Sequence, residues 1–189
     1  MRGCHVTGGT GPDLDGKGLV ASAPGSTSVV NEHPDEVDSS LTVKRDTKAS
    51  RAQVWAVMAD GWTYSQWVVG NSRMRAVDPD WPAVGSTIEH SIGVWPLLLD
   101  DLTVVEDCQP LEQLVLLAKG RPFGKARITL RLFDIDGGGC RIEMAEVFVG
   151  APLGWVPTRV ALTAALPRNR ECTWRLAAMA ERRHPDEVE

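Results

Sequence analysis

The sequence lacks several features that would point directly to a catalytic or metal-binding function. Its four cysteines lie far apart without a Cys-x-x-Cys pair, which argues against a zinc knuckle or a thioredoxin-type site, and we expect free thiols. Its four histidines are equally scattered, so we expect no metal site and no cofactor. The glycine-rich stretch at residues 8–11 is not followed by the Lys-Ser/Thr pair of a phosphate-binding loop.

Long apolar runs and an excess of basic residues are also absent. The longest apolar cluster, Val94–Leu99, is far shorter than the roughly 18 residues that a membrane span needs. The N-terminus has no apolar region of the kind found in secretory signals, so we expect a cytoplasmic location. The net charge of −5 argues against a nucleic-acid partner, because phosphate binding needs a clustered basic face.

Length and composition indicate one folded domain between two tails. A chain of 189 residues with 43% hydrophobic residues is long enough to form one core. Residues 1–37 are rich in Gly, Ser, Pro and Asp and lack periodicity, which predicts a disordered tail, as we also expect for residues 184–189. The folded domain is then expected over residues 38–183. The pentapeptide His-Pro-Asp-Glu-Val occurs on both sides of it, at His33–Val37 and His184–Val188, and we have no physical explanation for this repeat.

Hydrophobic periodicity predicts a strand, two short helices and then a series of strands. Leu41 and Val43 alternate with polar residues, as in a half-buried strand. Ser50 and Gln53 have the spacing of a capping box that begins a helix, and a second short helix is expected over Trp62–Trp67. Further strands are expected near residues 86–94, 102–106, 114–117, 126–133 and 140–148, after a proline-rich loop at 78–82 and with a glycine turn at 137–139. Sequential strands with short turns indicate an antiparallel sheet with one buried face.

The C-terminal part of the chain has the pattern of a long helix. From about Trp155 to Arg182 the apolar residues recur at helical spacing. Pro167 interrupts this run, and we expect a bend or a short break near Leu166 and Pro167. The predicted fold class is therefore α+β, with a curved antiparallel sheet of about six or seven strands wrapped around a long C-terminal helix.

Four segments give this pattern a family resemblance. They are Ser50–Met58, Trp62–Trp67, Val84–Thr87 and Arg168–Leu176. In this order of elements the chain resembles the helix-grip superfamily of START-domain, polyketide cyclase and pollen-allergen proteins (SRPBCC), and within it the bacterial polyketide cyclase/dehydrase and lipid-transport group. The resemblance implies a cavity between the sheet and the last helix that takes up lipids, sterols, polyketides or other apolar compounds. It implies no fixed catalytic motif, because this fold serves carriers, regulators and enzymes.

Such a cavity would be lined by apolar side chains with a few polar groups that orient a ligand. Trp95 and Phe123 lie in segments that connect strands and are candidates for guarding its entrance. For each candidate the alternative is that the side chain only fills the core, as most buried aliphatic residues do. The predicted lining consists of Trp62, Trp67, His90, Leu102, Val104, Leu116, Ile128, Leu130, Met144, Glu146 and Val160.

Two polar residues interrupt apolar faces and are the sharpest signals. His90 lies between Ile88 and Ile92 in its strand, and Glu146 interrupts the apolar face of the last strand. A buried carboxylate without partners tends to raise its pKa, so the two residues would suit acid/base chemistry, with Tyr64 assisting. The alternative is that each is paired with an internal arginine or backbone group, or that a bulge turns it to solvent.

Three functions are compatible with these patterns. The first is a carrier or sensor of a small hydrophobic molecule, which needs only the cavity. The second is a cyclase or dehydratase that uses His90 and Glu146. The third is an interaction module with an open apolar groove and a large exposed apolar patch. We favour the first; the sequence leaves the ligand and the oligomeric state open.

Overall fold

The computed structural model describes residues 42–119, 124–149 and 158–183. Three short helical elements follow the first strand, six more strands come next, and a long helix is the last described element. The elements are β1 (Val43–Thr47), α1 (Arg51–Ala59), η2 (Gly61–Thr63), α2 (Tyr64–Trp67), β2 (Asn71–Val77), β3 (Thr87–Val94), β4 (Leu97–Gln109), β5 (Gln113–Ala118), β6 (Lys125–Ile135), β7 (Gly139–Val149) and α3 (Thr158–Ala180).

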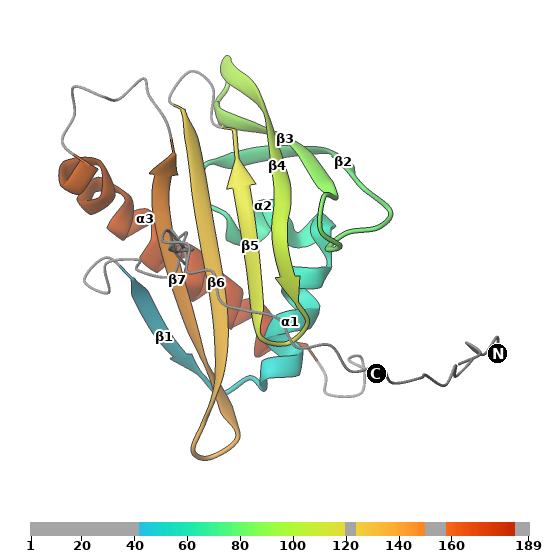
Figure 1. Cartoon of the computed structure of the whole chain (residues 1–189), viewed down its shortest axis with the longest axis vertical. Helices are drawn as coiled ribbons and strands as arrows, with labels where there is room; N and C mark the ends of the chain where they lie inside the picture. The colour runs from blue at the N-terminus through green and yellow to red at the C-terminus, as the bar shows by residue number, and fades with distance from the viewer. Residues whose placement is uncertain (1–41, 120–123, 150–157, 184–189) are drawn as a thin grey trace, which may run out of the picture. The chain divides into compact units, whose positions relative to one another are not determined.

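The strands form one seven-stranded antiparallel sheet. Their order is β1-β7-β6-β5-β4-β3-β2, so β2 to β7 follow one another across the sheet and β1 adds to its far edge. Each neighbouring pair is antiparallel. Figure 1 shows α3 running diagonally across one face of the sheet toward α1. The predicted α+β architecture, an antiparallel sheet with a long C-terminal helix, is confirmed.

Alternation along the central strands creates the core beneath the helices. In β6, Ile128, Leu130 and Leu132 are buried, whereas the residues between them are more exposed. The opposite strand β7 buries Ile142 and Met144 in the same way. Because successive side chains of a strand point to opposite faces, these residues gather on the face that α1 and α3 cover.

The short helices begin as the sequence predicts. The Ser50 side chain accepts a hydrogen bond from the Gln53 amide, and the Gln53 side chain accepts one from the Ser50 amide, so the capping box is present. The second helical segment consists of η2 and α2, where Asp60 caps η2 through the Trp62 amide. α3 is helical without interruption through Pro167. The helix therefore does not have the short break that was one of the two expectations for this position.

Two features of the sheet differ from the sequence prediction. β2 was not predicted, because this edge strand has bulges against β3 and its burial does not alternate. In β4 the buried residues are Asp101, Thr103 and Val105, so the prediction that Leu102 and Val104 share the inner face was wrong. The hydrophobic pattern predicted the wrong inner face for β4, because its inner face carries polar side chains and its outer face carries half-buried aliphatic ones.

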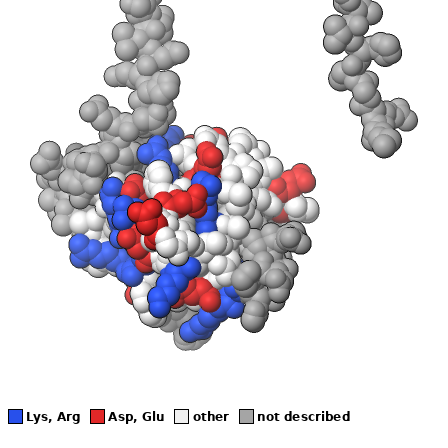
Figure 2. Space-filling view, turned by 90° about the horizontal axis from the view of Figure 1, so that it is seen from below, with Lys and Arg blue, Asp and Glu red and all other residues white. Residues whose placement is uncertain are grey.

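Several sequence predictions lie outside the described residues. These are the disordered tails at 1–37 and 184–189, together with both copies of His-Pro-Asp-Glu-Val. Within the described residues, no helix combines the length and the apolarity that crossing a membrane requires. Figure 2 shows acidic and basic side chains interspersed over the face seen from below, so the described residues of this face form no continuous basic surface.

Candidate functional site

A cavity of about 210 Å³ lies between the sheet and the segments of α2 and α3 that cover it. Strands β3 to β7 form its floor, and α2, the turn after it, the first residue of β2 and one residue of α3 line its other side. Its apolar wall includes Val68, Val69, Ile92, Ala118, Ala126, Ile128 and Phe148. Its polar groups are Tyr64, Asn71, His90, Asp101, Lys125, Glu146 and Arg168.

Four of the residues that the sequence singled out line this cavity. They are Tyr64, His90, Ile128 and Glu146. His90 and Glu146 are 2% and 5% exposed, so the two polar residues that interrupt apolar faces are both buried and both line the same space. The structure thus brings together the residues of the acid/base hypothesis, with Tyr64 beside His90 at a ring-centroid distance of 5.3 Å.

The other candidates lie elsewhere. Trp62 and Trp95 are 58% and 81% exposed, because Trp62 faces outward from η2 and Trp95 lies at the tip of the β3–β4 hairpin. Leu102 and Val104 point to the outer face of β4. Phe123 lies outside the described residues, and of Val160 only the helical backbone is described. The remaining candidates fill the core, which was the alternative for each of them: Trp67, Leu116, Leu130 and Met144.

Sequence reasoning missed four polar residues of the described cavity lining: Asn71, Asp101, Lys125 and Arg168. Asp101 lies directly opposite His90 in the β3–β4 register, so only the pairing of the strands reveals that both face inward. Asn71 begins the unpredicted strand β2. Arg168 belongs to the Arg168–Leu176 segment that carried the family resemblance, but its partner is 22 residues away in β7.

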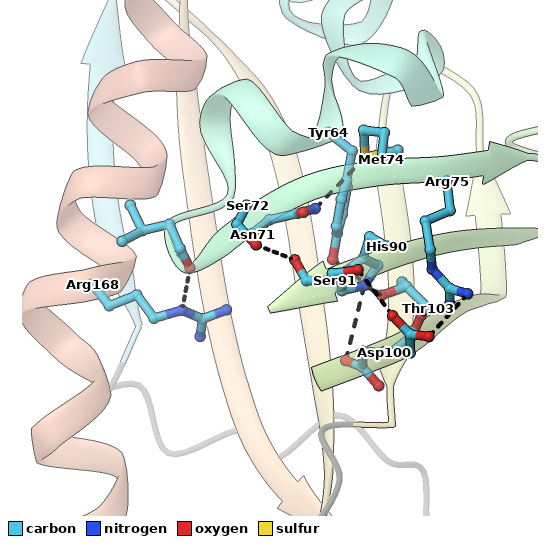
Figure 3. A network of polar contacts seen from close by, with 12 residues as sticks. Tyr64, Asn71, Ser72, Met74, Arg75, His90, Ser91, Asp100, Thr103 and Arg168 are labelled. Carbon is cyan, nitrogen blue, oxygen red and sulfur yellow. Dashed lines mark hydrogen bonds and ion pairs between the residues drawn. The ribbon is translucent and has the colours of Figure 1, made fainter. Parts of the chain in front are cut away.

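Two sets of polar contacts lie at the cavity. The first is a chain of hydrogen bonds centred on Thr103, which is completely buried. The Thr103 hydroxyl contacts His90 Nε2 at 3.0 Å and the Tyr64 hydroxyl at 3.2 Å. Figure 3 shows Tyr64 pointing from α2 toward His90 and Thr103 on the sheet. Burial raises the pKa of Tyr64 to about 12, so the phenol stays protonated at neutral pH.

The second set of polar contacts is an ion pair that joins α3 to the sheet. Arg168 Nη1 donates to both carboxylate oxygens of Glu146 at 3.0 Å, and its Nε donates to the Val69 carbonyl at 3.1 Å. Burial alone would lower the pKa of Arg168, but the Glu146 charge beside it raises the pKa above its ordinary value. The pairing of Glu146 with an internal arginine is the alternative that the sequence left open.

Among the described residues that line this cavity, three buried side-chain atoms have no hydrogen-bond partner. They are Asn71 Oδ1, His90 Nδ1 and Asp101 Oδ1. Buried polar atoms are nearly always paired, so each of these atoms has capacity for a further partner. Among the described residues, no group of three His, Cys, Asp or Glu side chains is close enough to hold a metal ion.

Burial of His90 has a consequence for stability at low pH. Burial lowers the pKa of His90 below 6.5, while Asp101 raises it less and Arg75 lowers it slightly. The unfolded chain therefore takes up the proton first, and stability is lost as the pH falls from 6.5 toward the lower folded-state value, by at most about 1.4 kcal/mol per pH unit. Urea unfolding between pH 7.5 and 5 measures this slope. His90→Gln should flatten it; an unchanged slope in that variant would contradict the assignment to His90.

The antiparallel sheet, the long helix across it and the cavity between them define a protein of the helix-grip class. Residues 38–181 match the model of the family described as polyketide cyclase / dehydrase and lipid transport, and the chain belongs to this family. No curated protein matches the chain.

Solved structures with the same fold have little sequence identity to this chain. A Staphylococcus aureus protein of unknown function, SA2116, superposes with a TM-score of 0.59 at 11% identity, covering 74% of this chain and 91% of that one. A Rhodobacter sphaeroides protein superposes at 0.57 with 21% identity and the same two coverages. Ara h 8.0201 superposes at 0.51 with 11% identity, covering 74% of this chain and 96% of that one. At these identities the likeness concerns the fold alone.

Proposed function

We propose that the chain binds a small, largely apolar molecule in the cavity between the sheet and α3, as a carrier or sensor. The observation that carries this proposal is the cavity itself, about 210 Å³ in volume and walled mainly by aliphatic and aromatic side chains. Ligand sites of soluble proteins typically combine such walls with a few polar groups that fix orientation. Membership of a family described by lipid transport and polyketide chemistry supports it.

The volume narrows the ligand class. An apolar cavity of roughly 150 Å³ admits a benzene-sized molecule. A cavity of about 210 Å³ therefore suits a molecule of one or two rings better than a sterol or a diacyl lipid.

The polar contacts of the cavity support a carrier or sensor better than they support an enzyme that uses His90 and Glu146. Both carboxylate oxygens of Glu146 accept hydrogen bonds from Arg168, so this side chain is engaged in a structural pair. A general base must lie within hydrogen-bond reach of the proton that it takes and be free to accept it. The cyclase or dehydratase alternative would have to rely on His90 and Tyr64.

Filling the cavity with a protein side chain tests the proposal. Ala118 lines the cavity at the end of β5, and Ala118→Phe places an aromatic ring where the ligand would lie. We expect the wild type to bind 2-naphthol and its methyl ether, followed by calorimetry, and the variant to bind both at least about tenfold more weakly because the space is occupied.

A matched control lies on the same strand. Leu117 points to the opposite face of β5 and does not line the cavity, so Leu117→Phe should bind the probes as the wild type does. Equal binding by the wild type and Ala118→Phe would refute the proposed site, and so would a wild type that binds none of the naphthalene probes.

A further inference from the structure

The unpartnered polar atoms of the cavity gather at one end of it. His90 and Asp101 are opposite each other in the β3–β4 register, and Asn71 is opposite Ile92 in the neighbouring β2–β3 pair. His90 and Asp101 are 2% and 6% exposed, and the Asn71 oxygen is itself buried. Figure 3 shows Asn71 and His90, which belong to adjacent strands, close to the Tyr64 side chain.

The contacts of Asn71 and His90 define the hydrogen-bonding character of their free atoms. The Asn71 amide nitrogen donates to the Met74 sulfur at 3.6 Å, which leaves the amide oxygen as the free atom. The Asp101 Oδ2 atom lies 3.9 Å from His90 Nε2 and favours a proton on that nitrogen, which donates to the Thr103 oxygen. We therefore assign the Nε2–H tautomer, in which Nδ1 carries a lone pair.

With this assignment all three free atoms are acceptors. Asn71 Oδ1, His90 Nδ1 and Asp101 Oδ1 each need a donor, and a buried acceptor without one is costly. Burial lowers the pKa of His90, which keeps the ring neutral and its Nδ1 an acceptor at neutral pH.

Charge in the cavity works against an anionic ligand. Two carboxylates, Asp101 and Glu146, line it, and the guanidinium of Arg168 already donates to Glu146 and to a backbone carbonyl. Among the described residues of the lining the remaining cation is Lys125, which is exposed, so water screens its charge. A carboxylate placed at the acceptor end would meet the lone pairs of Asn71 Oδ1, His90 Nδ1 and Asp101 Oδ1 and the charge of Asp101.

We propose that Asn71, His90 and Asp101 select ligands whose buried end is an uncharged hydrogen-bond donor, such as a hydroxyl group on an apolar ring, and reject carboxylates of the same shape. This inference rests on the proposed function and specifies the polar group of the ligand that the same cavity binds. It makes the three residues determinants of specificity, whereas the apolar wall determines size.

Three naphthalene probes of similar shape test the inference on the wild-type protein. They are 2-naphthol, which carries a donor, 2-methoxynaphthalene, which carries only an acceptor, and 2-naphthoate, which carries a negative charge. We expect 2-naphthol to bind at least about tenfold more tightly than either of the others, because each acceptor left without a donor weakens binding. Binding of 2-methoxynaphthalene or 2-naphthoate that equals or exceeds that of 2-naphthol overturns the inference and leaves the proposed function standing. Failure of all three to bind overturns the proposed function itself.

A pair of adjacent variants locates the selectivity. Asp101→Asn removes the buried negative charge and adds donor hydrogens, so the preference for 2-naphthol over 2-naphthoate should fall by about tenfold. Asp100→Asn removes the same charge from the exposed neighbour in β4, which does not line the cavity, and should leave the preference unchanged. An unchanged preference in Asp101→Asn, or an equal fall in Asp100→Asn, contradicts the assignment. The ranking of the probes on the wild type decides the inference if Asp101→Asn does not fold.

Discussion

Replacing Arg168 with methionine is expected to lower the free energy of unfolding by about 3 kcal/mol, because the buried Glu146 carboxylate loses its partner. Glu146 has a side chain that is only 4% exposed, and both of its oxygens accept from Arg168. The Arg168 side chain is 36% exposed, so solvent screens part of the interaction and the effect belongs at the lower end of the range for buried pairs. Thermal unfolding should show a decrease in Tm of roughly 6–12 °C for a chain of this size.

A surface pair on the same helix provides the control for Arg168→Met. Arg175 Nε donates to Glu171 one turn away, and both side chains are more than 40% exposed. Arg175→Met should therefore cost less than about 0.5 kcal/mol. The double variant Glu146→Leu/Arg168→Met should recover most of the loss, because a buried pair replaced by apolar groups leaves no unpaired charge. A similar loss in Arg168→Met and Arg175→Met would show that the buried ion pair does not stabilise the fold.

Much of the fold could be predicted from the sequence because its main signals are local. The capping box of α1, the alternation of β6 and the helical spacing of α3 each depend on residues within one element. β2 could not be found in this way, since its burial pattern follows its bulged pairing with β3 and not a period of two. The inner face of β4 was misassigned because Asp101 and Thr103 are polar and buried, which reverses the rule that hydrophobic residues mark the inside.

Only part of the candidate site could be predicted from the sequence, for a related reason. His90 and Glu146 attracted attention because they interrupt apolar faces, and both line the cavity. Their partners, Asp101 and Arg168, come from other elements and interact through strand register and the packing of α3 on the sheet. A sequence shows that a polar residue is buried, but the residue that satisfies it is determined by tertiary structure.

Thr103 is such a hidden partner, and Thr103→Val is expected to destabilise the protein by about 3 kcal/mol. Valine has the shape of threonine but no hydroxyl, so the buried His90 Nε2 and the buried Tyr64 hydroxyl both lose the contact that they make with Thr103. Each buried polar group left unpaired costs about 1–3 kcal/mol. Urea unfolding at pH 7.5 measures the loss.

Thr103→Ser separates the hydroxyl from the rest of the side chain. Serine keeps the oxygen that joins His90 to Tyr64 and removes one buried methyl group, for an expected cost of about 1 kcal/mol. If valine is tolerated as well as serine, the hydrogen bonds through Thr103 do not hold the polar end of the cavity together. If valine alone is costly, the Thr103 hydroxyl stabilises the fold by satisfying His90 Nε2, and Nδ1 is the ring nitrogen left for a ligand.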